Sequence, residues 1–371
     1  MANTDLISAA APATTTAAAA QQKDGICGIC PAGCFIQATF EHGEMRTVAP
    51  RLNHPLGMIC NNGAHSTDIV YDPDRLKHPL RRIGPKGSVE FERISWNEAF
   101  DIIEQRFKTI KAESGAEATA IYTGRGSFEL SLCDVFQPAG VAVSSASSVL
   151  FPFGSPNTLG VGALCYVSFA MIAPHVTFGE MYITLDPDIE QADSIVVWGA
   201  NPATDSPPTI HRQIIQARER GARVIAIDPR KNETALAVDA EWISIRPGTD
   251  GALALSMIQV LIEEELYDEK FVEEWTLGFE ELATYTQHFR PEVVEPITGV
   301  PAGTIVQLAR HLATTRGVSP VMYTGLEYSD SGVQAIRAVF TLWALAGQLD
   351  VPGGLLIRMR ENQFPINRDG L

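Results

Sequence analysis

The chain has 371 residues, 45% of them hydrophobic, and a formal net charge of −16. This length suggests two or three domains with a sizeable core, and the negative charge argues against binding to nucleic acid or anionic lipid. No apolar run reaches the roughly 18 residues that span a bilayer, and the N-terminus lacks the basic and apolar regions of an export signal, so we expect a cytoplasmic protein or an export signal on a partner subunit.

The N-terminal part divides into a tail and a cysteine-bearing segment. Residues 1–22 are rich in Ala and Thr, and we expect a disordered tail there. Residues 23–80 hold four of the six cysteines. Within them, apolar residues at 35–40 and 45–49 flank a polar turn, which predicts a β-hairpin.

Residues 81–371 alternate between helix and strand patterns. Ser95-Trp-Asn-Glu98 is typical of a helix-capping box, and Gly115 is a plausible stop for the helix that follows. We then expect strands at 118–122, 194–198, 223–227, 241–245 and 321–324, and helices at 210–220, 251–265 and 333–346. This alternation predicts an α/β fold with doubly wound, Rossmann-like parallel sheets, in two interleaved α/β subdomains.

The clustered cysteines indicate a metal site. Cys27, Cys30, Cys34 and Cys60 have the spacing C-x2-C-x3-C-x25-C. Four thiolates complete the iron corners of a 4Fe-4S cubane, and the close triplet lets one loop wrap three corners. A zinc site is the alternative, but zinc sites favour two short cysteine pairs.

Further motifs extend beyond the cysteines. From residue 24 to about residue 360 the chain resembles the dimethyl sulfoxide reductase family of molybdopterin enzymes. The segments that carry the resemblance are Tyr71-Asp-Pro-Asp-Arg-Leu76, Glu92-Arg-Ile-Ser-Trp96, Gly154-Ser-Pro-Asn157, Val197-Trp-Gly-Ala-Asn-Pro202, Asp228-Pro-Arg230, Arg246-Pro-Gly-Thr-Asp250 and Gly347-Gln-Leu-Asp-Val-Pro-Gly-Gly354.

The resemblance implies a molybdopterin guanine dinucleotide, bound by a set of loop residues. The residues themselves are compatible with this, because ligands of open α/β sheets lie beyond the carboxyl ends of strands, an acid there can accept from a ribose, and a helix start favours anions. The alternative is that the glycines are plain turn residues and the last acid an N-cap. The implied set is Gly199, Asn201, Asp228, Arg230, Gly248 and Asp250.

The resemblance also implies that the Cys165 thiolate binds molybdenum or tungsten, which suits a soft sulfur ligand. A buried structural cysteine is the alternative. His175 is the nearest downstream imidazole and a candidate catalytic acid or base, although a hydrogen-bonded structural role is more usual. Cys133 lacks such a context, so we interpret it as structural.

Two features depart from the family. Many relatives with a cluster have a Lys or Arg two residues after the fourth cysteine, where this chain has Asn62. Asn62 keeps hydrogen bonding but loses the charge, which puts the usual electron path in question. Family catalytic chains are also longer and end in a domain that covers the pterins, so we expect a fragment or a partner chain that supplies this part.

Three functions follow as hypotheses. The first is a molybdenum or tungsten oxidoreductase that transfers an oxygen atom or two electrons to or from a small-molecule substrate, with the 4Fe-4S cluster relaying electrons to a partner subunit. The second is a non-redox hydratase of the acetylene hydratase type on the same scaffold, in which the metal acts as a Lewis acid. The third is an electron-transfer subunit that uses the cluster alone.

Overall fold

The computed structural model describes residues 20–29, 33–54, 57–123, 150–160, 167–179, 184–204 and 208–358. The chain divides into two compact units. One contains residues 1–27 and 34–75, and the other contains residues 28–33 and 76–371. Among the described helices, none has the length and apolar character that crossing a membrane requires.

The first unit is a small antiparallel sheet followed by two short helices. Its strands are β1 (Gln21–Ile26), β2 (Phe35–Glu41) and β3 (Glu44–Pro50), in the order β1-β2-β3. His42 and Gly43 both have positive φ, 51° and 84°, as a tight two-residue hairpin turn requires. The predicted hairpin is therefore confirmed. Helices α1 (Asn61–Ala64) and α2 (Ser66–Tyr71) follow, and the Tyr71 hydroxyl accepts the Met45 amide at 2.7 Å.

The second unit begins with a hairpin and a long helix. Strands β4 (Leu80–Arg82) and β5 (Phe91–Arg93) are antiparallel, and α3 covers Trp96–Ser114. The Ser95 hydroxyl accepts the Glu98 amide at 3.1 Å, and Gly115 ends the helix with φ 82°, so the predicted cap and stop are confirmed.

The strand predicted at 118–122 starts later than expected. Residues Ala116–Ala118 form a 3-10 turn, η1, and Thr119 bonds back to it, its hydroxyl donating to the Ala116 carbonyl at 2.7 Å. Strand β6 therefore covers only Ile121–Thr123, and it pairs in parallel with β7 (Thr158–Gly160).

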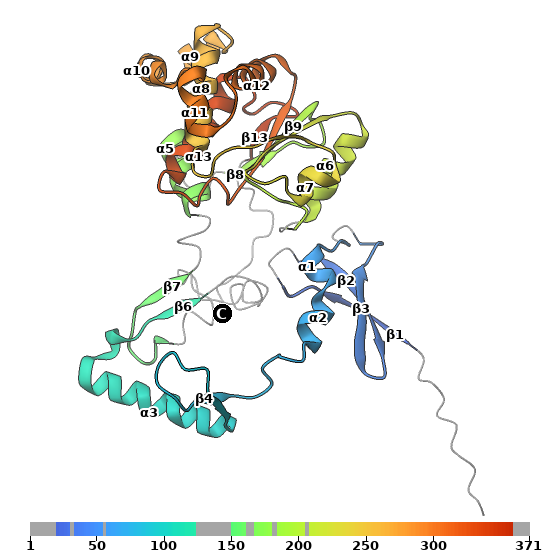
Figure 1. The fold of residues 1–371 in the computed structure, drawn as a ribbon, viewed down its shortest axis with the longest axis vertical. Helices are drawn as coiled ribbons and strands as arrows, with labels where there is room; N and C mark the ends of the chain where they lie inside the picture. The colour runs from blue at the N-terminus through green and yellow to red at the C-terminus, as the bar shows by residue number, and fades with distance from the viewer. Residues whose placement is uncertain are drawn as a thin grey trace, which may run out of the picture. The chain divides into compact units, whose positions relative to one another are not determined.

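The main sheet, in which Figure 1 labels β9, has four parallel strands in the order β11-β10-β9-β12. The first strand of the sheet along the chain is β9 (Ser194–Trp198), an inner strand. From it the chain runs through α6 (Pro208–Glu219), β10 (Arg223–Ile227) and α7 (Glu233–Ala237) to the edge strand β11 (Glu241–Ile243). It then returns through several helices to β12 (Val318–Met322), on the other side of β9. The direction of winding therefore reverses between β9 and β12, as in a doubly wound fold.

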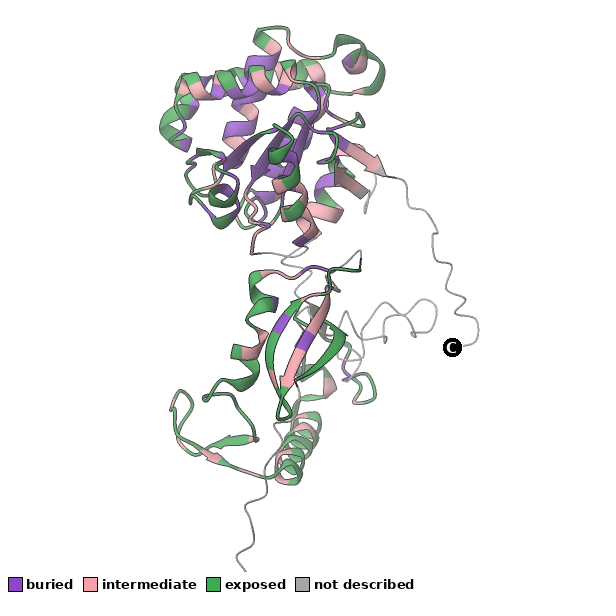
Figure 2. Ribbon diagram, turned by 90° about the vertical axis from the view of Figure 1, so that its right-hand side faces the viewer, coloured by how far each residue is buried: buried purple, intermediate pink, exposed green. Residues whose placement is uncertain are grey.

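Helices cover both faces of this sheet (Figure 1), and its strands are largely buried (Figure 2). The strand residues alternate between two cores. Val196 and Trp198 of β9 face the larger helical layer, whereas Ile195 and Val197 face the layer with α6 and α7. The larger layer comprises α8 (Asp250–Glu263), α9 (Glu269–Trp275), α10 (Phe279–Thr286), η5 (Gln287–Phe289), α11 (Pro291–Thr298), α12 (Ala302–Thr314) and α13 (Gly332–Leu345). The α/β fold with a parallel sheet and a β-rich N-terminal region is therefore confirmed.

Two strand predictions need correction. The strand expected at 321–324 lies at 318–322 and includes Pro320. Proline is tolerated there because β12 is an edge strand of this sheet, with a neighbouring strand on one side only. The strand expected at 241–245 ends at Ile243.

Several elements were not predicted. A π-helix, η4 (Val167–Ile172), leads into α5 (Ala173–Phe178), and β8 (Thr184–Pro187) pairs antiparallel with β13 (Leu355–Arg358).

Candidate cofactor-binding site

Four loops meet at the carboxyl edge of the parallel sheet. They follow β9, β10, β11 and β12 and cover residues 199–204, 228–232, 244–249 and 323–331. Because parallel strands end at the same edge, the loops that carry the predicted dinucleotide residues come together there.

Two glycines are in backbone contact between the ends of β9 and β12, where the direction of winding reverses. Gly199 has φ +59°, donates its amide to the Ile227 carbonyl at 3.0 Å and accepts the Gly325 amide at 2.9 Å. A Cβ at Gly325 would lie 2.6 Å from the Gly199 oxygen, which is too close for any side chain. The β9 and β12 loops therefore touch backbone to backbone at the switch point, where open α/β sheets bind their ligands.

Asn201 joins the loop after β9 to the start of α7. Its Oδ1 accepts from the Thr234 amide at 3.1 Å and from the Thr234 hydroxyl at 2.8 Å. Its Nδ2 donates to Glu233 Oε2 at 2.6 Å and to the Thr204 hydroxyl at 2.9 Å. The side chain therefore fixes the shape of the loop on both sides.

Asp228 has the same role in the loop after β10. Its Oδ1 accepts the Arg230 amide at 2.8 Å, and its Oδ2 accepts Asn232 Nδ2 at 3.1 Å. The same Asn232 nitrogen lies 3.1 Å from the Ala200 carbonyl and so connects the two loops. Arg230 forms an ion pair with Glu233 at 3.1 Å, and hydrogen bonds from a backbone amide, Asn201 and Arg230 lower the pKa of Glu233.

Gly248 and Asp250 differ in exposure. Gly248 is exposed and has φ 78°. Asp250 is the first residue of α8, is buried and accepts the Trp198 indole N–H at 2.8 Å. Burial raises the pKa of Asp250, and the hydrogen bond from Trp198 lowers it. In this structure Asp250 thus connects α8 to the end of β9, and a contact with a cofactor stays a prediction.

Three of the four clustered cysteines are described, and all lie in the first unit or at its edge. Cys27 and Cys34 are buried, and the Cys27 amide donates to the Cys34 carbonyl at 2.9 Å. A Cβ at Gly63, three residues after Cys60, would lie 3.5 Å from Cys27 Sγ. The first turn after Cys60 therefore passes beside the Cys27 sulfur.

Within the described residues, no group of three or more His, Cys, Asp or Glu side chains is arranged to hold a single metal ion. A cubane holds its cysteine sulfurs farther apart than a single ion does, and the cluster stays a prediction. Cys30, Cys133 and Cys165 lie outside the described residues.

The structure is similar to that of acetylene hydratase from Pelobacter acetylenicus, with a TM-score of 0.69 and 28% identity over 90% of this chain and 44% of that one. The family model for molybdopterin oxidoreductase matches residues 75–360. The chain belongs to the molybdopterin oxidoreductase family.

Sequence relatives agree with this assignment. The molybdopterin-containing subunit PhsA of thiosulfate reductase from Salmonella typhimurium is 31% identical over 335 residues, which are 89% of this chain and 41% of that protein. Dimethyl sulfoxide reductase DmsA of Escherichia coli is 31% identical over 80% of this chain and 38% of its own length. The chain therefore spans half or less of the length of these relatives.

The segment predicted to precede the metal ligand in this family is held by hydrogen bonds to η1 and to the residue after it. The Ser155 hydroxyl donates to the Thr119 carbonyl at 2.7 Å, and Asn157 Nδ2 donates to the Glu117 carbonyl at 2.6 Å. His175 is exposed on α5, and its carbonyl accepts the Gly179 amide. No described contact assigns its imidazole a catalytic partner.

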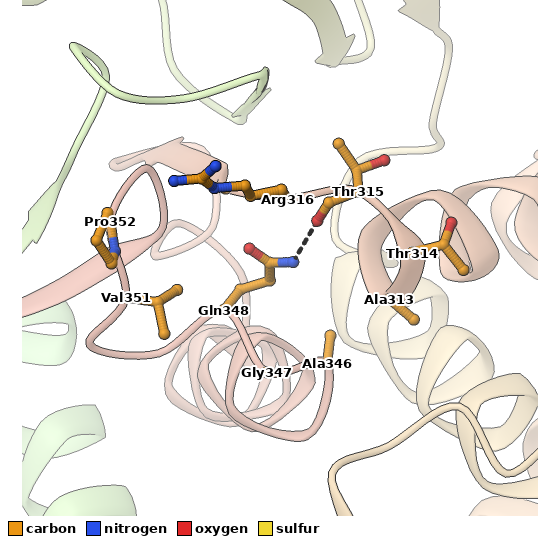
Figure 3. A pocket seen from close by; sticks show the side chains of 10 residues that line it. Ala313, Thr314, Thr315, Arg316, Ala346, Gly347, Gln348, Val351 and Pro352 are labelled. Carbon is orange, nitrogen blue, oxygen red and sulfur yellow. Dashed lines mark hydrogen bonds between the residues drawn. The ribbon is translucent and has the colours of Figure 1, made fainter.

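A pocket of about 410 Å³ lies at the opposite, amino edge of the sheet (Figure 3). It is lined by the ends of α12 and α13 and by part of the family segment that begins at Gly347. Its central polar side chain, Gln348, donates to the carbonyls of Leu312 and Thr315, each at 2.9 Å, and accepts the Val318 amide. That segment therefore has a structural contact at the amino edge of the sheet, away from the four loops.

Sequence reasoning missed several residues of the loop network. Asn232 and Thr234 are buried and bond the predicted Asn201 and Asp228. Asn232 was detectable as a helix N-cap, because its side chain accepts the Ala235 amide in the pattern Asn-Glu-Thr-Ala. Glu327 carries no such local signal, because it is one of two acids, with Asp330, in the loop after β12.

Proposed function

We propose that this chain is the cofactor-binding part of a molybdenum or tungsten enzyme that holds molybdopterin guanine dinucleotide at the carboxyl edge of the β11-β10-β9-β12 sheet. The observation that carries the proposal is the switch-point crossing of Gly199 and Gly325, with the hydrogen-bonded loops beside it. It coincides with the family match over residues 75–360.

The residues fit a dinucleotide. The close approach of Gly199 and Gly325 leaves no space for a Cβ, so backbone groups rather than side chains form that surface. Asn201 and Asp228 hold the two neighbouring loops in shape, and Arg230 lies on the exposed side of the second loop. Gly248 and the start of α8 would receive the anionic part of the ligand, as helix starts do. A preformed site avoids the free-energy cost of ordering its loops on binding.

We further propose that Cys27, Cys30, Cys34 and Cys60 bind a 4Fe-4S cluster. The burial of Cys27 and Cys34 and the turn that brings Gly63 beside Cys27 support this. The cluster would pass electrons to a partner subunit, with Asn62 in the place of the usual cation.

The Cys165 thiolate would complete the metal coordination, and His175 would serve as an acid or base near it. When bound, the pterin-held metal supplies oxygen-atom or two-electron transfer. The chain's own residues bind and orient the cofactor and the small-molecule substrate. We propose a cytoplasmic location for the complex.

A hydratase is the second candidate. The structural similarity to acetylene hydratase, with a TM-score of 0.69, supports it, and Asn62 is consistent with a cluster that transfers no electrons. In this case substrate would be converted without an electron acceptor, whereas an oxidoreductase would need one.

The test is metal and cofactor analysis of the full chain after anaerobic purification, together with its partner where one co-purifies. About four irons, one molybdenum or tungsten, and guanine nucleotide released on acid treatment are expected per chain. Iron without molybdenum, tungsten or guanine nucleotide would leave the cluster-only subunit as the function, and stoichiometric zinc would refute the cluster.

A further inference from the structure

Glu327 is a buried acid beside the switch point. It lies in the loop between β12 and α13, two residues after Gly325, and is 7% exposed. Its neighbour Leu326 is fully buried, and its own amide donates to the Thr324 carbonyl at 3.1 Å. The loop therefore directs this side chain into the protein.

One carboxylate oxygen of Glu327 holds the π-helix η4. Oε1 accepts the Phe169 amide at 2.9 Å. The Phe169 ring packs edge-on against Tyr323 and Phe340, with centroid distances of 5.4 Å and 5.7 Å. The first turn of η4 is thus fixed by one hydrogen bond and two ring contacts. π-Helical turns occur often at functional sites.

The other oxygen, Oε2, is buried and has no hydrogen-bond partner among the described residues. This is unusual, because buried polar atoms nearly always have partners. Burial raises the pKa of Glu327 to about 7, and the Phe169 amide lowers it.

Several ionisable side chains lie on the loop and helices near Glu327. Tyr323, Tyr328 and Asp330 share the loop, His175 is on α5 and Arg337 is on α13. Burial and the Phe169 amide are the two causes of the shift.

The location connects Glu327 with the proposed metal ligand. Cys165 lies two positions before Val167, the first residue of η4, and four positions before Phe169. Groups that hydrogen-bond a metal ligand fix its orientation and are needed for metal affinity, and we extend this reasoning to a bond that holds the chain beside the ligand.

We propose that Glu327 is the positioning residue of the metal-ligand segment: by accepting the Phe169 amide, it anchors the helix that follows Cys165 to the β12 loop at the switch point. This inference rests on the proposed function for the role of Cys165. The anchor itself joins two described elements that are 158 residues apart in the chain.

The test compares Glu327→Leu with Glu327→Gln in the full-length chain. Leucine has a similar volume but leaves the Phe169 amide buried without an acceptor, whereas glutamine keeps a carbonyl oxygen for it. The matched control is Glu295→Leu, because Glu295 Oε2 also accepts the amide of a first-turn residue, Ala302 of α12, at 2.8 Å.

Hydrogen exchange by mass spectrometry over residues 161–172 is the first readout. An unsatisfied buried amide should speed exchange about 10- to 100-fold in E327L, while E327Q and E295L stay within about threefold of the parent. The second readout is alkylation of the Cys165 thiol in cofactor-free protein, with Cys133 as internal reference. It should accelerate in E327L alone.

Unchanged exchange in E327L, or equal effects of E327L and E327Q, would overturn the anchor. If E327L does not fold, Glu327→Asp replaces it, because it keeps the charge and withdraws the acceptor by one methylene. The proposed function fails separately: if loading the parent with cofactor does not protect Cys165 from alkylation, Cys165 is not the ligand, whatever the exchange of η4 shows.

Discussion

The contact between Gly199 and Gly325 leads to a quantitative prediction for Gly325→Ala. An added Cβ would lie 2.6 Å, 2.7 Å and 2.9 Å from the oxygen, Cα and carbonyl carbon of Gly199. These atoms are backbone, so no rotamer change relieves the clash, and the β9 and β12 loops must separate. Overpacking of this kind costs about 2 kcal/mol, which for a unit of this size lowers the melting temperature by about 3 °C.

Gly303→Ala is the matched control, with the opposite sign. Gly303 lies in the first turn of α12, is exposed and has no atom within 4 Å of an added Cβ. Alanine favours helix over glycine, so this variant should gain about 0.5 kcal/mol. Thermal unfolding followed by circular dichroism measures both variants, and guanine nucleotide content should fall in G325A alone. Equal melting temperatures for G325A and the parent would refute the assigned glycine crossing.

Three further predictions concern the loops, the cysteines and pH. Asp228→Ala removes the carboxylate that accepts the Arg230 amide and the Asn232 side chain, and should lower guanine dinucleotide retention by about tenfold with unchanged iron content. The control Asp268→Ala removes only the N-cap of α9 and should leave retention unchanged. Gly63→Ala places a Cβ 2.7 Å from Ile59 and 3.5 Å from Cys27 Sγ and should reduce iron content, while Gly25→Ala, which meets no atom within 4 Å, should not. The pKa of Glu327 is raised from 4.5 to about 7, so the free energy of unfolding of the parent should fall relative to that of E327Q as the pH rises from 4.5 to 7. The expected loss is on the order of 2 kcal/mol after solvent screening, with a plateau above pH 7. Parallel pH profiles from urea titrations would contradict the burial of a titrating carboxyl.

Elements with local signals were predictable. Ser95 and Gly115 bound α3 through a hydroxyl cap and a left-handed glycine, and the turn at His42 and Gly43 closes the hairpin. Both signals depend on a few adjacent residues. The limits of β12 depend instead on its place at the sheet edge, which allows Pro320 within the strand. Edge position is a tertiary property, so the strand was predicted three residues too late.

The site shows the same division. Sequence patterns selected Asn201 and Asp228, which do lie in loops at one edge of the sheet. They did not predict that both side chains are used to hold those loops. Glu327 could not be predicted as a site residue, because its hydrogen-bond partner Phe169 is distant in the chain and becomes adjacent only through the winding of the sheet.

The charged groups at the carboxyl edge of the main sheet bear on how a chain with a negative net charge could bind an anionic cofactor. The two arginines beside these loops already have partners: Arg230 pairs with Glu233, and Arg246 donates to the Pro296 carbonyl at 2.9 Å. Parallel crossovers also start α7, α8 and α13 at this edge, so the positive ends of their dipoles lie there. We therefore propose that backbone amides near Gly199 and Gly248 and the helix starts bind the phosphates of the cofactor over a few ångströms, alongside the exposed Lys231 of the loop after β10. The net charge of −16 is screened over about 8 Å at physiological salt, so under the proposed function it would oppose such short-range donors little, and the shape that Gly199 and Gly325 give the loops would decide which anion fits.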